Sequence, residues 1–192
     1  MLKRQQLNPV EFPKSAKTTT MYFNAKSLTL LAITALTTIT SAENIQYDAF
    51  ASTVECSGAK FSCFDGGALC CALPPAFGFS VQFNNFAVAE QGQGYTGSTC
   101  ADFLFALFGP GTKCWNGGGV RATHANWFHT SGRRTIDPHA VNPNCTTPSS
   151  FTYHDELSGT ERTIKVPPNG ADEVAEFYVK KDFAKLASYA TY

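Results

Sequence analysis

Seven cysteines constrain the fold of this chain more than any other feature. All of them follow residue 55. They are Cys56, Cys63, Cys70, Cys71, Cys100, Cys114 and Cys145. In an exported domain such a set predicts a disulfide framework. A structural zinc site needs short Cys-x₂₋₄-Cys pairs, whereas the gaps here are six, six, zero, 28, 13 and 30 residues. We therefore expect disulfides, and neither a metal nor another cofactor.

The sequence leaves the pairing of these cysteines open. The adjacent Cys70 and Cys71 point in diverging directions along an extended backbone, so we expect them to reach two different partners. We expect the two cysteines upstream of them to be those partners, and Cys100 to pair with Cys114. Cys145 is then the unpaired one, either as a buried thiol in a monomer or as the bridge of a disulfide-linked dimer.

The first 42 residues have the three parts of an export signal. Lys26 precedes an apolar run of 12 residues at 28–39, and small residues follow at 40–42. This order defines a secretory signal peptide, whereas a membrane-spanning helix needs about 20 apolar residues. We predict cleavage after residue 42 and secretion of residues 43–192 as a single cysteine-rich domain without a membrane span.

Residues 1–20 precede Met21, which can itself begin a conventional signal peptide. They are either an extended basic segment or the product of a start codon assigned too far upstream. We favour the second explanation, because nothing in them has a periodic apolar pattern that could fold.

The charge of the secreted part restricts its partners. Ten basic and fourteen acidic residues follow residue 42, which gives a net charge of about −4. A mildly acidic domain is a poor ligand for nucleic acid or for an anionic membrane. We expect neither as a partner.

Alternation of apolar and polar residues predicts several strands. The clearest covers 77–83, and its phase shifts after Asn84-Asn85, which predicts a bulge or a tight hairpin. A less regular strand is predicted over 120–128. Further on, a hairpin is predicted from the extended segments 151–153 and 163–166, which flank a turn at Ser158-Gly159.

Two segments have helical spacing. Apolar residues at i, i+3, i+4, i+7 and i+8 predict a short central helix over 100–108, ended by Gly109-Pro110. An apolar stripe predicts a second helix at the C-terminus, and the glycine-rich segment 89–99 is predicted as a loop. The expected fold is a small disulfide-stapled α+β domain with an antiparallel β-sheet, one short central helix and a C-terminal helix.

No catalytic motif is present, so we name no catalytic residue. The sequence lacks a Gly-x-Ser-x-Gly elbow, a His-Glu-x-x-His pair and a Walker loop. His124 and His129 are five residues apart, which suits one face of neither a helix nor a strand. A pair of catalytic carboxylates that meets only in the folded protein stays open.

Surface modification and binding have a few candidates. Asn144-Cys145-Thr146 is an N-glycosylation sequon, so Asn144 is a glycosylation candidate. Arg133-Arg134 is either a dibasic processing site or a pair of solvated side chains. Aromatic side chains in or next to predicted loops can stack on sugars or anchor a protein partner. The candidates are Trp115, Trp127 and Tyr95.

The signal peptide, the Cys-x₆-Cys-x₆-Cys-Cys cluster and the aromatic-rich domain resemble the small secreted cysteine-rich proteins of filamentous fungi. Hydrophobins also carry a Cys-Cys pair, but they have eight cysteines with two such pairs. The resemblance implies an effector-like or cell-wall-associated protein. We expect a secreted, non-enzymatic protein that binds a polysaccharide or an extracellular protein. A small extracellular hydrolase and a secreted toxin or antimicrobial protein are the alternatives.

Overall fold

The structure is a computed structural model that describes residues 44–65, 67, 69–130 and 145–192. All of these residues belong to one compact unit, Thr40–Tyr192. The predicted signal peptide, Asn144 and the Arg133-Arg134 pair lie outside the described residues.

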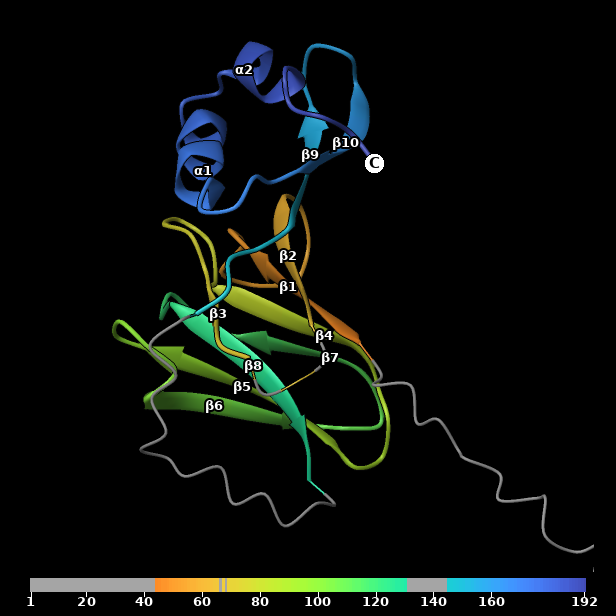
Figure 1. The fold of residues 1–192 in the computed structure, drawn as a ribbon, viewed down its shortest axis with the longest axis vertical. Helices are drawn as coiled ribbons and strands as arrows, with labels where there is room; N and C mark the ends of the chain where they lie inside the picture. The colour runs from red at the N-terminus through yellow and green to blue at the C-terminus, as the bar shows by residue number, and fades with distance from the viewer. Residues whose placement is uncertain (1–43, 66, 68, 131–144) are drawn as a thin grey trace, which may run out of the picture. The chain divides into compact units, whose positions relative to one another are not determined.

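The described part of the chain is mostly β, so the predicted α+β class is wrong (Figure 1). It holds ten strands and two short helices. The strands are β1 (Ile45–Phe50), β2 (Lys60–Asp65), β3 (Cys71–Ala72), β4 (Ser80–Phe86), β5 (Glu90–Thr96), β6 (Asp102–Phe108), β7 (Gly111–Asn116), β8 (His124–His129), β9 (Ser150–Asp155) and β10 (Thr160–Lys165). The helices are α1 (Ala171–Val179) and α2 (Phe183–Ala187).

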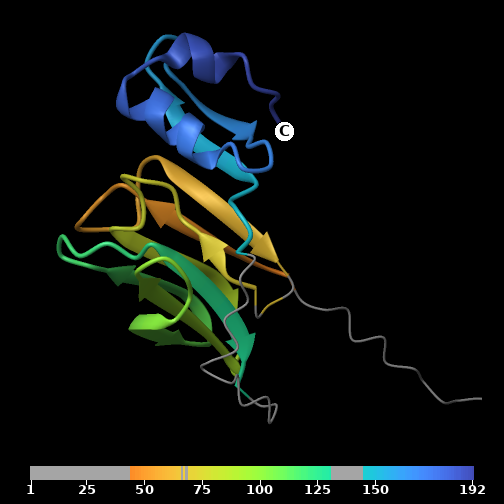
Figure 2. The same ribbon diagram turned by 60° about the vertical axis from the view of Figure 1, so that its left-hand side comes forward.

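The strands form two antiparallel sheets. A six-stranded sheet has the order β10-β9-β2-β1-β4-β7, and a four-stranded sheet has the order β3-β8-β5-β6. The ring of Phe105 on β6 stacks on that of Trp115 on β7, with 4.1 Å between centroids, so the edge strands of the two sheets meet there. Strands β5, β6 and β8 of the four-stranded sheet lie at the end of the domain away from the helices (Figure 1 and Figure 2).

The predicted central helix at 100–108 is the edge strand β6 instead. Five of the seven residues of β6 are Phe or Leu. A nearly continuous apolar run contains helical spacing by coincidence, and periodicity alone cannot distinguish the two structures. Both faces of β6 are apolar, and Phe103 and Phe108 at its two ends are 60% exposed.

The predicted loop at 89–99 is largely strand β5, because two of its glycines make room for aromatic rings. A Cβ on Gly92 would lie 2.6 Å from the ring of Phe83, and one on Gly94 would lie 2.0 Å from the ring of Phe105. These rings pack directly on the β5 backbone. Glycine here serves close approach and not a turn.

The predicted hairpin after residue 150 is confirmed as β9 and β10, paired from Thr160↔Asp155 to Lys165↔Ser150. The strand predicted at 77–83 begins later, at Ser80, because Phe77 lies in the preceding loop with its ring in the core. A register shift between Phe83 and Phe86 confirms the predicted irregularity at Asn84-Asn85.

The C-terminal segment is two short helices and not one. Lys181 adopts a left-handed backbone with φ of 58° and ends the first. Asp182 then caps α2 by accepting a hydrogen bond from the Lys185 backbone N–H at 3.1 Å. Tyr178 on α1 and Phe183 on α2 pack against the ring of Tyr153, which lies on β9. The two helices therefore cover the β9–β10 end of the six-stranded sheet. No helix in the described residues is long and apolar enough to cross a membrane.

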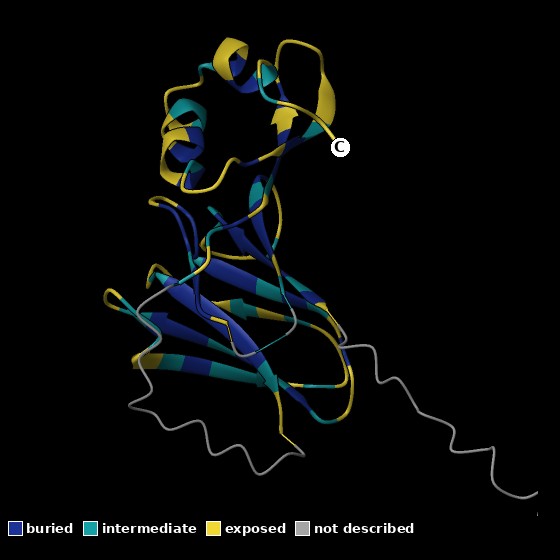
Figure 3. Ribbon diagram, viewed as in Figure 1, coloured by how far each residue is buried: buried dark blue, intermediate teal, exposed yellow. Residues whose placement is uncertain are grey.

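The core lies on one face of the six-stranded sheet. Alternate side chains of β1, β2, β4 and β9 face it, and the largest of them are aromatic. They are Tyr47, Phe61, Phe83, Phe151 and Tyr153. Figure 3 shows burial concentrated in the central strands, and exposure on the outer sides of the helices and β10.

Three disulfides staple the domain: Cys56–Cys114, Cys63–Cys71 and Cys70–Cys100. Cys70 and Cys71 reach different partners, as expected, and Cys145 is the free cysteine. Cys63 is one of the two expected upstream partners, but the expected pairing of Cys56 with Cys70 or Cys71 is wrong, because Cys56 pairs with Cys114. The expected Cys100–Cys114 bridge is wrong as well. The reason is topological, since β7 is an edge of the six-stranded sheet and Cys100 precedes the edge of the other one.

Candidate binding site

A buried carboxylate organises the outer face of the six-stranded sheet. Asp48 lies in the middle of β1, between Ser62 on β2 and Gln82 on β4 in the strand register. Residues directly opposite each other in an antiparallel pair project from the same face. Asp48 thus points away from the aromatic core, yet its side chain has no solvent exposure.

Four side chains donate hydrogen bonds to the Asp48 carboxylate. Gln46 Nε2 and Ser62 Oγ reach Oδ1 at 2.8 and 2.6 Å. Lys60 Nζ and Asn84 Nδ2 reach Oδ2, both at 3.0 Å. A carboxylate has about four acceptor positions, so this one is fully used. Asp48 therefore holds its neighbours in place and has no lone pair left for a ligand.

The side chains fixed in this way line a pocket of about 520 Å³. The pocket extends across the ends of β1, β2 and β4. It is lined by Asn44, Ile45, Gln46, Asp48, Lys60, Phe64, Asn84 and Asn85. Four of these eight residues are amides, and only two are apolar. The volume is in the range of small-molecule sites in proteins, about 300–1,000 Å³.

The irregular β4 strand places the amides at the pocket. Asn84 accepts a hydrogen bond from Gln82 Nε2 at 2.6 Å while it donates to Asp48, which fixes its orientation. Asn85 follows with a left-handed φ of 56°. Its backbone N–H donates to Thr112 Oγ1 on β7 at 3.2 Å. The register shift between Phe83 and Phe86 thus coincides with these two amides of the pocket lining.

The chemistry of the pocket favours a neutral polar ligand. Its two charged groups, Asp48 and Lys60, neutralise each other at 3.0 Å. Amide side chains offer both donors and acceptors, as hydroxyl groups do. Phe64, opposite Gln46 in the register, is 59% exposed and presents an aromatic ring at the pocket. Amides beside an open aromatic face can hold a ligand that combines hydroxyl groups with C–H surfaces.

The three predicted aromatic binding residues lie elsewhere and are engaged in packing. Trp127 has no exposure, and its Nε1 donates to the Asp65 carbonyl at 3.2 Å. Tyr95 is buried, and its hydroxyl donates to Gln93. Trp115 stacks on Phe105 and is partly buried against the core. The structure does not gather these rings into one surface.

The sequence reasoning missed the pocket, although a signal was present. In the β1 segment Ile-Gln-Tyr-Asp-Ala-Phe, apolar residues alternate with Gln46 and Asp48. That alternation indicates a strand with one polar face. No strand is predicted from the sequence before residue 77, so this polar face is identified only in the structure.

The buried carboxylates in the described residues belong to separate groups. Asp48 is held as described above. Glu90 accepts from the Ala87 backbone N–H at 2.5 Å and lies 3.6 Å from His129 Nδ1. Asp155 accepts from Ser158 and the Leu157 backbone, on the β9–β10 turn. No two of them share a partner.

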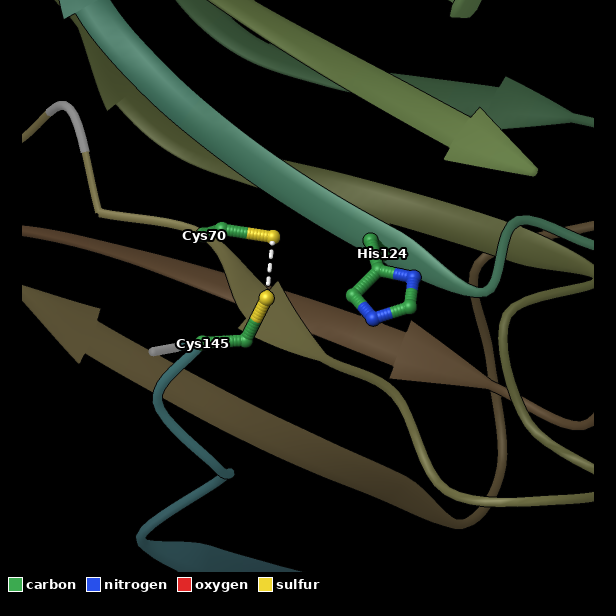
Figure 4. Close-up of side chains that lie close together, drawn as sticks. All are labelled: Cys70, His124 and Cys145. Atoms are coloured by element: carbon green, nitrogen blue, oxygen red, sulfur yellow. Dashed lines mark hydrogen bonds between the residues drawn. The ribbon is translucent and has the colours of Figure 1, made fainter. Parts of the chain in front are cut away.

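His124 and His129 occupy opposite ends of β8. His124 lies near two cysteine sulfurs, and the donor atoms of Cys70, His124 and Cys145 lie within 4.8 Å of one another (Figure 4). Such a group has the spacing of a metal site. However, Cys70 is bonded to Cys100, and a disulfide sulfur is not the thiolate that binds a metal. In this oxidation state the group does not fit a metal.

Comparison with known proteins gives one match in the form of a family model. The model is described as ARB_05566_N, an N-terminal domain, and it matches residues 47–149. That is 103 of the 192 residues and includes five of the eight pocket-lining residues and all seven cysteines. The match ends directly before β9, so β9, β10 and both helices lie outside it. No curated protein and no solved structure matches the chain.

Proposed function

The chain belongs to the family described as ARB_05566_N, an N-terminal domain, and we propose that it is a secreted, non-enzymatic protein that binds sugar residues of a polysaccharide. The observation that carries this proposal is the amide-lined pocket beside exposed Phe64. Its side chains are already held in place before a ligand arrives. Preorganisation reduces the entropy lost on binding.

The charge balance of the pocket supports a sugar over the other ligands. A phosphate or nucleic-acid site needs unpaired positive charge, whereas Lys60 is paired with Asp48. Neutral hydroxyl groups can instead accept from the remaining Lys60 and Asn84 protons and donate to amide oxygens. The ring of Phe64 would pack against the C–H face of a sugar, as aromatic side chains do at amphipathic surfaces.

Secretion is part of the proposal. Three disulfides in one small domain are typical of oxidising compartments. The predicted signal peptide at 1–42 gives a route to such a compartment. An intact mass of the protein from culture medium that begins at residue 43 is the expected result. Retention of residues 1–42 in the mature protein would contradict this part.

The presence of a single carboxylate among the pocket-lining residues supports binding over hydrolysis. A glycosidase needs two carboxyl groups about 5–10 Å apart across a cleft. In the pocket the one carboxylate, Asp48, is fully occupied by four donors. It is therefore unsuited to act as a general acid or a nucleophile.

A sedimentation assay with insoluble polysaccharides tests the proposal. The purified secreted protein is mixed with chitin, cellulose, β-glucan and mannan, and the bound fraction is measured by depletion. Phe64→Ala should weaken binding to the recognised polymer about 5- to 150-fold, because one stacking side chain contributes about 1–3 kcal/mol.

Phe103→Ala is the matched control. Phe103 is 60% exposed, against 59% for Phe64, but it lies on β6 in the other sheet. We expect this variant to bind as the unmodified protein does. Equal loss in both variants, or binding unaffected by Phe64→Ala, would contradict the assignment of the pocket.

A further inference from the structure

The free thiol of Cys145 lies against a disulfide of its own chain. Its Sγ is 2.9 Å from Sγ of Cys70, which is bonded to Cys100 (Figure 4). Reacting atoms in a near-attack arrangement are about 3–3.5 Å apart. The two sulfurs are thus close enough for thiol–disulfide exchange.

Backbone hydrogen bonds on both sides of the pair hold the chain around Cys145 next to Cys70. The Thr146 N–H donates to the Cys70 carbonyl at 2.7 Å, and the Ala72 N–H donates to the Thr146 carbonyl at 2.8 Å. The Thr146 hydroxyl also donates to the Cys70 carbonyl, at 3.2 Å. The chain around Cys145 therefore lies parallel to the start of β3 and cannot move away without losing these bonds.

We propose that Cys145 and Cys100 exchange for the bond to Cys70, so that the domain exists as two disulfide isomers. The inference is independent of the proposed sugar binding. It assigns to this three-cysteine group a chemical activity, namely intramolecular thiol–disulfide exchange.

The exchange balances without an external oxidant or reductant. Cys145 Sγ loses its proton and attacks Cys70 Sγ as a thiolate, since the thiolate is the nucleophile. The Cys70–Cys145 bond forms as the Cys70–Cys100 bond breaks, and Cys100 leaves with the electron pair and takes up a proton. Three disulfides and one thiol are present before and after.

His124 is placed to handle the proton. One of its ring nitrogens lies within 4.8 Å of the Cys145 sulfur, and its Nδ1 lies 3.0 Å from the Thr123 hydroxyl. Burial, and then the positive charge of Arg121, lower the pKa of His124. The imidazole is therefore neutral at physiological pH and able to accept a proton.

The thiol itself needs such a base. Burial raises the pKa of Cys145, and a hydrogen bond from the Cys100 backbone opposes that rise. The other ionisable groups here are Tyr47, whose pKa burial and Asp65 raise, and Asp65 itself, which accepts from the Tyr47 hydroxyl at 2.7 Å. Exchange should therefore accelerate as the pH rises and thiolate forms.

The two isomers differ in what they cross-link. Cys70–Cys100 joins the residue directly before β3 to the segment before β6, and these two strands are the edges of the four-stranded sheet. Cys70–Cys145 would instead join β3 to the segment that leads into β9 of the other sheet. Exchange would then expose a thiol at half-buried Cys100 in place of the one at half-buried Cys145.

Trapping of the free thiol followed by peptide mapping tests the proposal. The secreted protein is held at pH 8, alkylated with N-ethylmaleimide in denaturant, and digested without reduction. We expect the label on both Cys145 and Cys100, and both the Cys70–Cys100 and the Cys70–Cys145 linked peptides. A label confined to one of the two cysteines after prolonged incubation would overturn the proposal.

Two serine variants give an independent readout. Cys100→Ser should keep three disulfides by forming Cys70–Cys145, and Cys145→Ser should keep Cys70–Cys100 with no free thiol. Two free thiols, Cys70 and Cys145, in folded Cys100→Ser would overturn the proposal. If this variant does not accumulate, the mapping of the unmodified protein decides.

His124→Gln separates proton transfer from packing. After a jump from pH 3 to pH 8, the label on Cys100 should approach the same final fraction as in the unmodified protein. The approach should be about 10²-fold slower, the lower end of the contribution of a general base. An unchanged rate would remove His124 from the mechanism, and a changed final fraction would show a structural role only.

Discussion

Replacement of Asp48 by alanine tests how the pocket is held together. The change removes an acceptor that four donors share. Three of the donors, Gln46, Lys60 and Asn84, are half-buried and can turn toward water. Ser62 cannot, because it is 4% exposed. Its hydroxyl becomes a buried donor without a partner.

The expected loss of unfolding free energy follows from how far each of these four donors is buried. An orphaned buried hydroxyl costs about 1–3 kcal/mol. The three half-buried donors add less than about 1 kcal/mol each, because water replaces the lost acceptor. We expect Asp48→Ala to lower the free energy of unfolding by about 2–4 kcal/mol. Glu161→Ala, at an exposed position of β10, should change it by less than about 0.5 kcal/mol.

Urea denaturation with the disulfides intact measures both values, and a double variant isolates the cause. Asp48→Ala/Ser62→Ala should be more stable than Asp48→Ala by about 1 kcal/mol, since the orphaned hydroxyl is gone. A loss below about 0.5 kcal/mol for Asp48→Ala would refute the reasoning. A loss of unfolding free energy in the double variant equal to the sum of the losses in Asp48→Ala and Ser62→Ala would refute the reasoning as well.

Three further predictions concern the rest of the domain. Gly94→Ala should lower the free energy of unfolding by about 1–3 kcal/mol, because its Cβ would lie 2.0 Å from the Phe105 ring; urea midpoints measure this. Lys181→Gly should raise it by about 0.5–1 kcal/mol, because glycine adopts the left-handed φ of 58° without strain; thermal unfolding measures this. The lowered pKa of His124 means that the unfolded chain binds its proton first, so its contribution to stability is present above about pH 6.5 and is lost as the pH falls through the folded pKa. Urea midpoints of His124→Gln should therefore fall less between pH 7 and pH 5 than those of the unmodified protein, and an equal fall would contradict the assignment.

Local sequence patterns predicted those elements whose structure is decided locally. The β9–β10 hairpin has alternating apolar residues around a Ser-Gly turn, and both its strands and its turn are present. The break in register at Asn84-Asn85 is likewise visible as a phase shift in the sequence. These features need no knowledge of what packs against them.

Elements decided by packing were predicted wrongly. Strand β5 contains Gly92 and Gly94, which resemble loop residues until the rings of Phe83 and Phe105 are seen against them. Nearly all residues of β6 are apolar, so the spacing of its apolar positions does not distinguish a strand from a helix. The disulfide between Cys56 and Cys114 likewise depends on the placement of β7 at a sheet edge.

The candidate site also combines a feature that local sequence shows with contacts that depend on how the strands pair. Polar alternation in β1 could have indicated a polar sheet face. The pairing of Asp48 with Lys60 and Asn84 depends on the register of three strands, which no local pattern shows. The exposed aromatic ring at the pocket is that of Phe64, whereas the binding role predicted for Trp115, Trp127 and Tyr95 stays a prediction.

The measurement that tests the account most directly is an NMR titration of the isotope-labelled secreted protein with soluble oligosaccharides. The oligosaccharides come from the polymer that retains the protein in sedimentation. We predict that the largest shifts fall on the side-chain amides of Gln46 and Asn84 and on the backbone around Phe64, and that β6 is unaffected. Shifts centred on β6, or none at saturating ligand, would contradict the claim that the amide-lined pocket on the six-stranded sheet binds sugar.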